Sequence, residues 1–226
     1  MGLSANPDLF EILNKKGQLI DLVYQNTLQS LNLIKKVLTD LMKEYGKKFP
    51  DGSKSIALVR EDMGDFEVHL KFAGDVLVFS MHTNIFEFSR YHEVMSTAYI
   101  RQDKERSYCG IINIYNFLSD SFKYNRVNDI GYLIGRLFIN KDRSYFIEGK
   151  REVGLLYNNF GQEVFDEAAA RKLVESAILY AINFDLLTPP FDSVKEISLE
   201  EVKSMVDSYT LKTGKRLGFK FQADQG

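Results

Sequence analysis

The stretch that decides the fold is residues 66–83, FEVHLKFAGDVLVFSMHT. In its first half every second residue is apolar, which is typical of a half-buried β-strand. Ala73-Gly74 predicts a turn, and the apolar run from Val76 to Thr83 predicts a second, more central strand. We therefore expect an antiparallel hairpin. Its alternation assigns six residues to the core face: Val68, Leu70, Phe72, Leu77, Phe79 and Met81.

The other face of this hairpin carries the side chains with the most chemistry. An even position on the first strand pairs with an odd position on the second, so Glu67, His69 and His82 share this face. Two imidazoles and a carboxylate suit Zn²⁺, or Fe²⁺ with open positions. The alternative interpretation is a polar sheet face without a ligand, on which Glu67 and a histidine form a hydrogen bond. Lys71 on the same face argues against a cation site, and we favour the interpretation without a ligand.

Short apolar segments with tight turns lie on both sides of the hairpin. They predict further strands at 56–61, 107–117, 132–139, 144–148 and 152–157. Strands do not alternate with helices in this region, which argues against Rossmann and TIM-barrel architectures. The sequence therefore predicts an antiparallel sheet of about six to seven strands.

A long helical segment precedes the sheet. Asn6 and Pro7 are a favourable helix start, and we expect a short helix to Lys16, a bend at Gly17 and a longer helix over 18–45. Apolar residues in the longer helix are spaced by alternating fours and threes, which is typical of a helix that packs along another element. They are Ile20, Tyr24, Thr27, Leu31, Ile34, Leu38, Leu41 and Tyr45.

This apolar face has two interpretations. The favoured one is that the helix lies across the protein's own sheet. The other is that it also pairs with a second subunit, so that the chain forms a homo-oligomer. The candidate self-association residues are Ile20, Leu31, Ile34, Leu38 and Leu41.

The chain returns to helix near Phe165, and Pro189-Pro190 ends that helix. Ser198 and Glu201 form a capping box, which predicts another helix to about Tyr209. We therefore expect a single α+β domain over 1–226. It has N-terminal helices at 7–46, the antiparallel sheet at 55–160, two C-terminal helices within 165–210 that pack on the sheet, and a basic tail at 211–226.

Composition restricts the setting of this domain. A net charge of −2 argues against a nucleic-acid-binding protein, and a single cysteine excludes an internal disulfide. No apolar run is long enough to span a bilayer, and no signal peptide is visible. We expect a cytoplasmic protein without a membrane or nucleic-acid partner, and we predict no cofactor and no bound metal.

A second group of polar residues is a candidate nuclease-like metal site. Glu148-Gly149-Lys150 resembles the E-x-K half of the PD-(D/E)xK nuclease signature, with Asp129 as a candidate upstream carboxylate. In such sites carboxylates hold Mg²⁺ and the lysine stabilises charge at the phosphate. The Pro-Asp dipeptide is missing, and we favour the interpretation that these three residues are the solvated end of a strand.

The leading hypothesis is a non-catalytic binding or regulatory module that self-associates through its N-terminal helix. The alternative is a metal-dependent hydrolase or nuclease that uses one of two clusters, Glu67/His69/His82 or Asp129/Glu148/Lys150.

Overall fold

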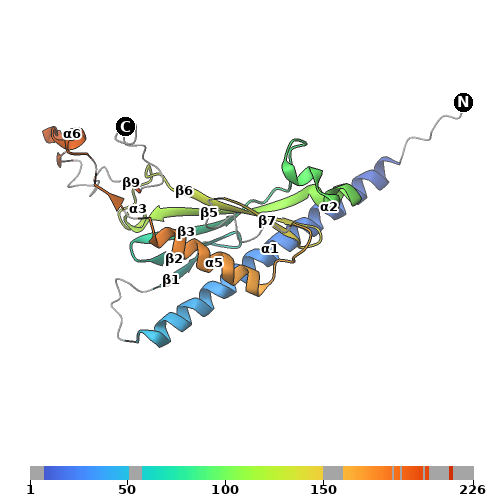
Figure 1. Cartoon of the computed structure of the whole chain (residues 1–226), viewed down its shortest axis with the longest axis horizontal. Helices are drawn as coiled ribbons and strands as arrows, with labels where there is room; N and C mark the ends of the chain where they lie inside the picture. Colours follow the sequence, from blue (N-terminus) through green and yellow to red (C-terminus); the bar gives the residue numbers. More distant parts are fainter. Residues whose placement is uncertain are drawn as a thin grey trace, which may run out of the picture.

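The fold was obtained as a computed structural model (Figure 1). It describes residues 8–50, 58–149, 160–184, 186–188, 190–200, 202–203 and 214–215. The main elements are α1 (Leu9–Lys48), β1 (Val59–Asp62), β2 (Glu67–Phe72), β3 (Asp75–Met81), β4 (Phe86–Glu87), β5 (Tyr108–Leu118), β6 (Tyr132–Asn140), β7 (Tyr145–Gly149) and α5 (Glu167–Ile182). The shorter elements are η2 (Glu93–Ser96), α2 (Ala98–Gln102), η3 (Lys104–Ser107), α3 (Ser119–Lys123), α6 (Phe191–Val194), β8 (Leu186–Leu187) and β9 (Gly214–Lys215).

The sheet is a seven-stranded antiparallel meander. Its strands follow the order β1-β2-β3-β5-β6-β7, and the short strand β4 pairs with β5 off this path. Every neighbouring pair is antiparallel. The predicted α+β class, with a long N-terminal helix before an antiparallel sheet, is confirmed.

The register of the central hairpin is also as predicted. Leu70 pairs with Leu77 and His69 with Val78, so the apolar and polar sets lie on opposite faces. Ala73 and Gly74 both have positive φ, 44° and 90°. This is the pattern of a two-residue type I′ turn, whose twist matches that of the strands it joins.

The predicted bend at Gly17 is wrong. Helix α1 runs without a break from Leu9 to Lys48, and its N-cap is Asp8, whose side chain accepts a hydrogen bond from the backbone N–H of Phe10 at 3.0 Å. A helical glycine costs only about 1 kcal/mol relative to alanine. That cost is small beside the packing that the rest of a 40-residue helix provides.

One face of the sheet is covered by two helices, α1 and α5, which also contact each other (Figure 1). Leu70 and Phe79 are both fully buried between the sheet and these helices, as the alternation predicts. Alanines dominate the buried side of α5, so its backbone lies close to its neighbours. The helix members of this core include Leu31, Ile34, Leu38, Ala170, Leu173, Val174 and Ala177.

The burial of Leu31, Ile34 and Leu38 bears on the self-association candidates. These three side chains are 0% exposed within the chain's own core. Leu41 packs on the same core and is partly buried, and Ile20 is exposed. The favoured interpretation of the apolar face, packing on the protein's own sheet, therefore accounts for most of these residues. Only the part of α1 around Ile20 and before it is left for a partner.

Several predicted elements cannot be compared. The strand at 152–157 lies outside the described residues, as do most of the helix at 198–209 and most of the tail at 211–226. Among the C-terminal helices α5 is present as expected, and the next helical segment, α6, is only four residues long. None of the described helices has both the length and the apolarity needed to cross a membrane.

Candidate functional site

The second face of the sheet is partly covered by the segment between β4 and β5. Phe88 packs against Phe138, Phe146 and Phe160, with ring centroids 5.0, 6.3 and 6.1 Å apart. Cys109 lies buried in the same cluster, and burial raises the pKa of its thiol. The cysteine is therefore a small core residue, and the segment is held by aromatic contacts.

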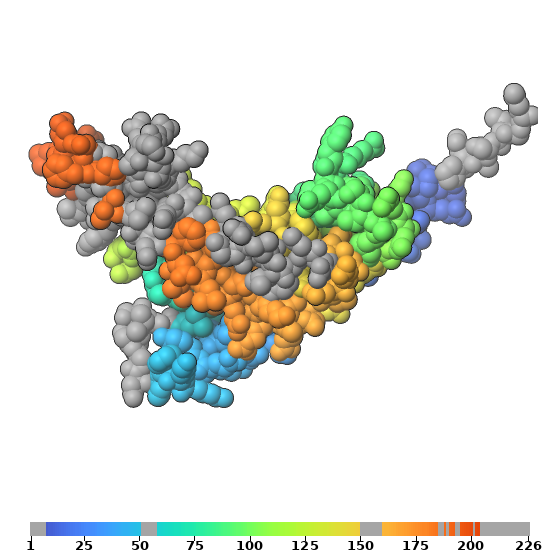
Figure 2. Space-filling view, in the orientation of Figure 1, coloured from blue at the N-terminus to red at the C-terminus, as the bar shows by residue number. Residues whose placement is uncertain are grey.

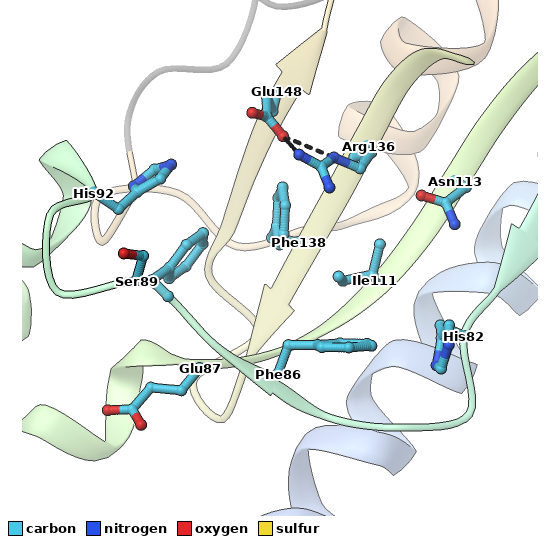
Figure 3. A pocket seen from close by; sticks show the side chains of 11 residues that line it. His82, Phe86, Glu87, Ser89, His92, Ile111, Asn113, Arg136, Phe138 and Glu148 are labelled. Carbon is cyan, nitrogen blue, oxygen red and sulfur yellow. Dashed lines mark hydrogen bonds and ion pairs between the residues drawn. The ribbon is translucent and has the colours of Figure 1, made fainter. Parts of the chain in front are cut away.

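A concave pocket of about 390 Å³ opens beside this cluster (Figure 3). Strands β5, β6 and β7 supply its floor, and the chain from the end of β3 to η2 supplies its rim. We call it the sheet-face pocket. It is lined by Phe86, Phe88, Phe138 and Ile111, and by the polar residues His82, Glu87, Ser89, His92, Asn113, Arg136 and Glu148.

Arg136 is the permanent cation of the sheet-face pocket. It lies opposite Glu148 in the β6–β7 register, and its Nε donates to Glu148 Oε2 at 2.7 Å. Its Nη2 donates to the same oxygen. Nη1 has no acceptor among the described residues, and Figure 3 shows it turned into the pocket. Arg136 is therefore held in place by one carboxylate oxygen and keeps a free donor group.

The two histidines at the rim are fixed in the same tautomer. His82 Nδ1 accepts the backbone N–H of Asn84 at 3.0 Å, and His92 Nδ1 accepts that of Val94 at 3.3 Å. In a neutral imidazole one nitrogen accepts and the other donates. Nε2 therefore carries the proton in both rings. A ligand that meets either ring at Nε2 meets a hydrogen-bond donor.

The predicted constellation of Glu67, His69 and His82 does not form one site. His69 Nε2 lies 2.7 Å from Glu67 Oε1, which is the Glu–His hydrogen bond expected for a polar face without a ligand. His69 is buried beneath Phe122 of α3, with ring centroids 5.2 Å apart. His82 instead makes an edge-to-face contact with Phe86, with ring centroids 4.8 Å apart, and lines the sheet-face pocket.

The second predicted cluster is also divided. Asp129 accepts a hydrogen bond from Ser121 at 2.6 Å and pairs with Arg126 at 2.9 Å. Glu148 is engaged with Arg136, and Lys150 lies outside the described residues. Across the part of the chain that the structure describes, no group of three His, Cys, Asp or Glu side chains could hold a metal ion.

Sequence reasoning missed Asn113, Arg136, Phe86 and Phe88. Alternation within 132–139 does place Arg136 and Phe138 on one face, so part of the signal was present. Nothing local determines the register that places Asn113 opposite Arg136, because residues 119–131 separate β5 from β6 and no tight turn joins the two strands.

A second concavity, of about 420 Å³, lies where the C-terminal ends of α1 and α5 meet the β2–β3 turn. Its lining is mostly apolar, and one of its two charged residues, Glu44, is engaged by Arg171 at 2.8 Å. We call it the helix-end groove. It is lined by Leu41, Glu44, Tyr45, Lys48, Leu58, Phe72, Ala73, Ile178 and Ile182. It offers few polar groups to orient a ligand.

Comparison of this chain with models of protein families, with curated proteins and with solved structures gave no match.

Proposed function

We propose that the chain is a cytoplasmic, non-catalytic binding or regulatory module and that the sheet-face pocket is its ligand site. The observation that carries this proposal is the convergence of polar donors on an apolar floor in one concavity. Small-molecule sites in proteins have this character, with a few placed polar groups in a mostly apolar lining. Among the described residues, Glu67 pairs with His69, Asp129 with Ser121 and Arg126, and Glu148 with Arg136, so we do not propose the metal-dependent hydrolase.

A tryptophan reporter tests the proposal directly, because the chain contains no tryptophan. Phe86 lines the pocket and is 38% exposed, so Phe86→Trp places one indole at the rim with little risk to folding. We expect 4-iodobenzoate or 4-iodobenzyl alcohol to quench this indole with a saturable dependence on concentration, because a bound iodine atom is held beside it.

The matched control is Tyr91→Trp, because Tyr91 is 99% exposed and lies outside the pocket lining. There we expect only linear, collisional quenching by both compounds. Linear quenching at both positions, with equal slopes, would contradict the proposed ligand site.

Self-association is the second part of the proposal, and the N-terminal part of α1 favours it. The apolar stripe that buries Leu31 continues back to Leu13 and Leu9, which are 65% and 70% exposed. Figure 2 shows this end of α1, in blue, at a projecting end of the molecule. The occupant we propose is a second copy, because antiparallel pairing about Leu13 would place Glu11 opposite Lys15 of that copy, whose exposed ion pair with Glu105 it would share.

We expect light scattering at micromolar concentration to give more than the monomer mass of 26.0 kDa. Leu13→Lys should return the mass to that of a monomer, because it places a charge in the middle of the exposed stripe. Gln29→Lys is the control, since Gln29 is an exposed polar residue of the same helix and lies outside the exposed stripe. A wild-type mass of 26.0 kDa would exclude self-association at that concentration.

A further inference from the structure

We infer that the sheet-face pocket binds a small planar aromatic carboxylate, with the ring against the apolar floor and the carboxylate at Arg136 and Asn113. This inference rests on the proposed function. It adds the chemical class of the ligand and the residues that recognise it.

The floor suits a ring. Phe138 and Ile111 are cross-strand partners on β6 and β5, and Phe86 and Phe88 approach from the rim strand and the segment after it. Figure 3 shows Phe86, Ile111 and Phe138 gathered between the polar side chains. Aromatic rings favour offset or edge-to-face contact with other rings, and a pocket of about 390 Å³ is at the small end of ligand sites. One ring, or two fused rings, fits this space.

The carboxylate end is defined by two neighbouring donors. Asn113 and Arg136 are direct partners in the β5–β6 register, so their side chains leave the same face of the sheet about 5 Å apart. The Asn113 side chain makes no hydrogen bond within the described residues, and Arg136 keeps Nη1 free. Two N–H groups of a guanidinium and an adjacent amide match the two oxygens of a carboxylate.

The acidic residues of the pocket do not favour a cationic ligand. Glu148 is neutralised by Arg136, as the shared oxygen shows. Glu87 accepts the hydroxyl hydrogen bond of Tyr108 at 3.2 Å, and Figure 3 shows its carboxylate turned away from the pocket. The histidine Nε2–H groups add donors and no acceptor. The free groups around the floor therefore suit a ligand that brings acceptor oxygens.

The test uses the wild-type protein and three compounds that share one ring. They are 4-iodobenzoate, 4-iodobenzyl alcohol and 4-iodobenzylamine, and their affinities are measured by isothermal titration calorimetry. We expect the carboxylate to bind about tenfold more tightly than the alcohol, because it gains a charge-assisted contact with Arg136. Arg136→Gln should remove that tenfold advantage, and Asn113→Ala should reduce it severalfold without touching the ion pair.

The variant Glu148→Gln gives a prediction of opposite sign. Removing this carboxylate frees the Arg136 charge for the ligand, so the affinity for 4-iodobenzoate should rise by about threefold or more. Lys48→Gln is the control, because it removes a charge from the helix-end groove and should leave all three affinities unchanged. Thermal melting of each variant establishes that it is folded before its affinity is compared.

The outcomes separate the two proposals. If none of the three compounds binds the wild-type protein, the proposed ligand site itself fails. If the alcohol or the amine binds as tightly as the carboxylate, the proposed ligand site is retained and the inferred ligand class is overturned. The same holds if the folded variants Arg136→Gln and Asn113→Ala leave the affinity for the carboxylate unchanged.

Discussion

Replacing Phe79 with alanine should lower the free energy of unfolding by about 3–5 kcal/mol. Phe79 is among the largest fully buried side chains, and it lies in the middle of β3 between Val68 of β2 and Ile114 of β5. Truncation removes apolar contacts on all sides and leaves a cavity that the surrounding strands cannot close. Urea denaturation followed by circular dichroism measures the loss.

The matched control is Phe86→Ala, the same change at a side chain that is 38% exposed. We expect it to cost about 1 kcal/mol or less. His69→Ala should also cost clearly less than Phe79→Ala, because it removes one hydrogen bond to a partly exposed Glu67 and one ring contact with Phe122. A loss at His69 equal to the loss at Phe79 would indicate a bound ligand or a larger buried network there.

Gly110→Ala is the second change with a large expected effect. Gly110 lies on β5 directly under α1, and a Cβ atom there would be 2.0 Å from Thr27 Oγ1 and 2.8 Å from Thr27 Cβ. Thr27 is fully buried on α1, so the helix or the strand must shift. We expect a loss of about 2–3 kcal/mol in the free energy of unfolding, which is typical of overpacking a core.

Two variants make this result specific. Gly17→Ala is the same substitution in a position where a Cβ meets nothing within 4 Å, and it should stabilise the protein by up to about 1 kcal/mol. Thr27→Ala removes the nearest atom, so combining it with Gly110→Ala should recover part of the loss in a double-mutant cycle. If Gly110→Ala is as harmless as Gly17→Ala, α1 does not lie on β5 at this point.

The hairpin was predictable because its information is local. Alternation over 66–83 determines which residues share a face, and a single turn determines the register, so the opposite faces of His69 and Leu70 follow from the sequence alone. The bend at Gly17 was predicted wrongly for a related reason. A local propensity of about 1 kcal/mol is outweighed when the helix around it packs on a sheet.

The apolar stripe of α1 shows a limit of periodicity. A spacing of fours and threes indicates that one helix face is covered, and it does not indicate what covers it. The structure assigns Leu31 and Leu38 to the chain's own core and leaves Ile20 exposed, although all three belong to the predicted stripe.

The sheet-face pocket could not be predicted from the sequence. Asn113 and Arg136 are neighbours only because β5 pairs with β6 in one particular register. The rim comes from residues between β3 and η2, where no hydrophobic period indicates that the chain returns over the sheet. The aromatic contacts of Phe88 with Phe138 and Phe146 fix that return, and they join segments far apart in the chain.

The central claim is that the ligand site lies on the sheet face opposite α1 and α5. The most direct test is a ¹H–¹⁵N NMR titration of the wild-type protein with 4-iodobenzoate. We predict saturable shifts centred on the backbone amides of Ile111, Asn113, Arg136 and Phe138. Shifts confined to the helix-end groove, at Leu41, Tyr45, Ile178 and Ile182, or the absence of any saturable shift, would contradict the account.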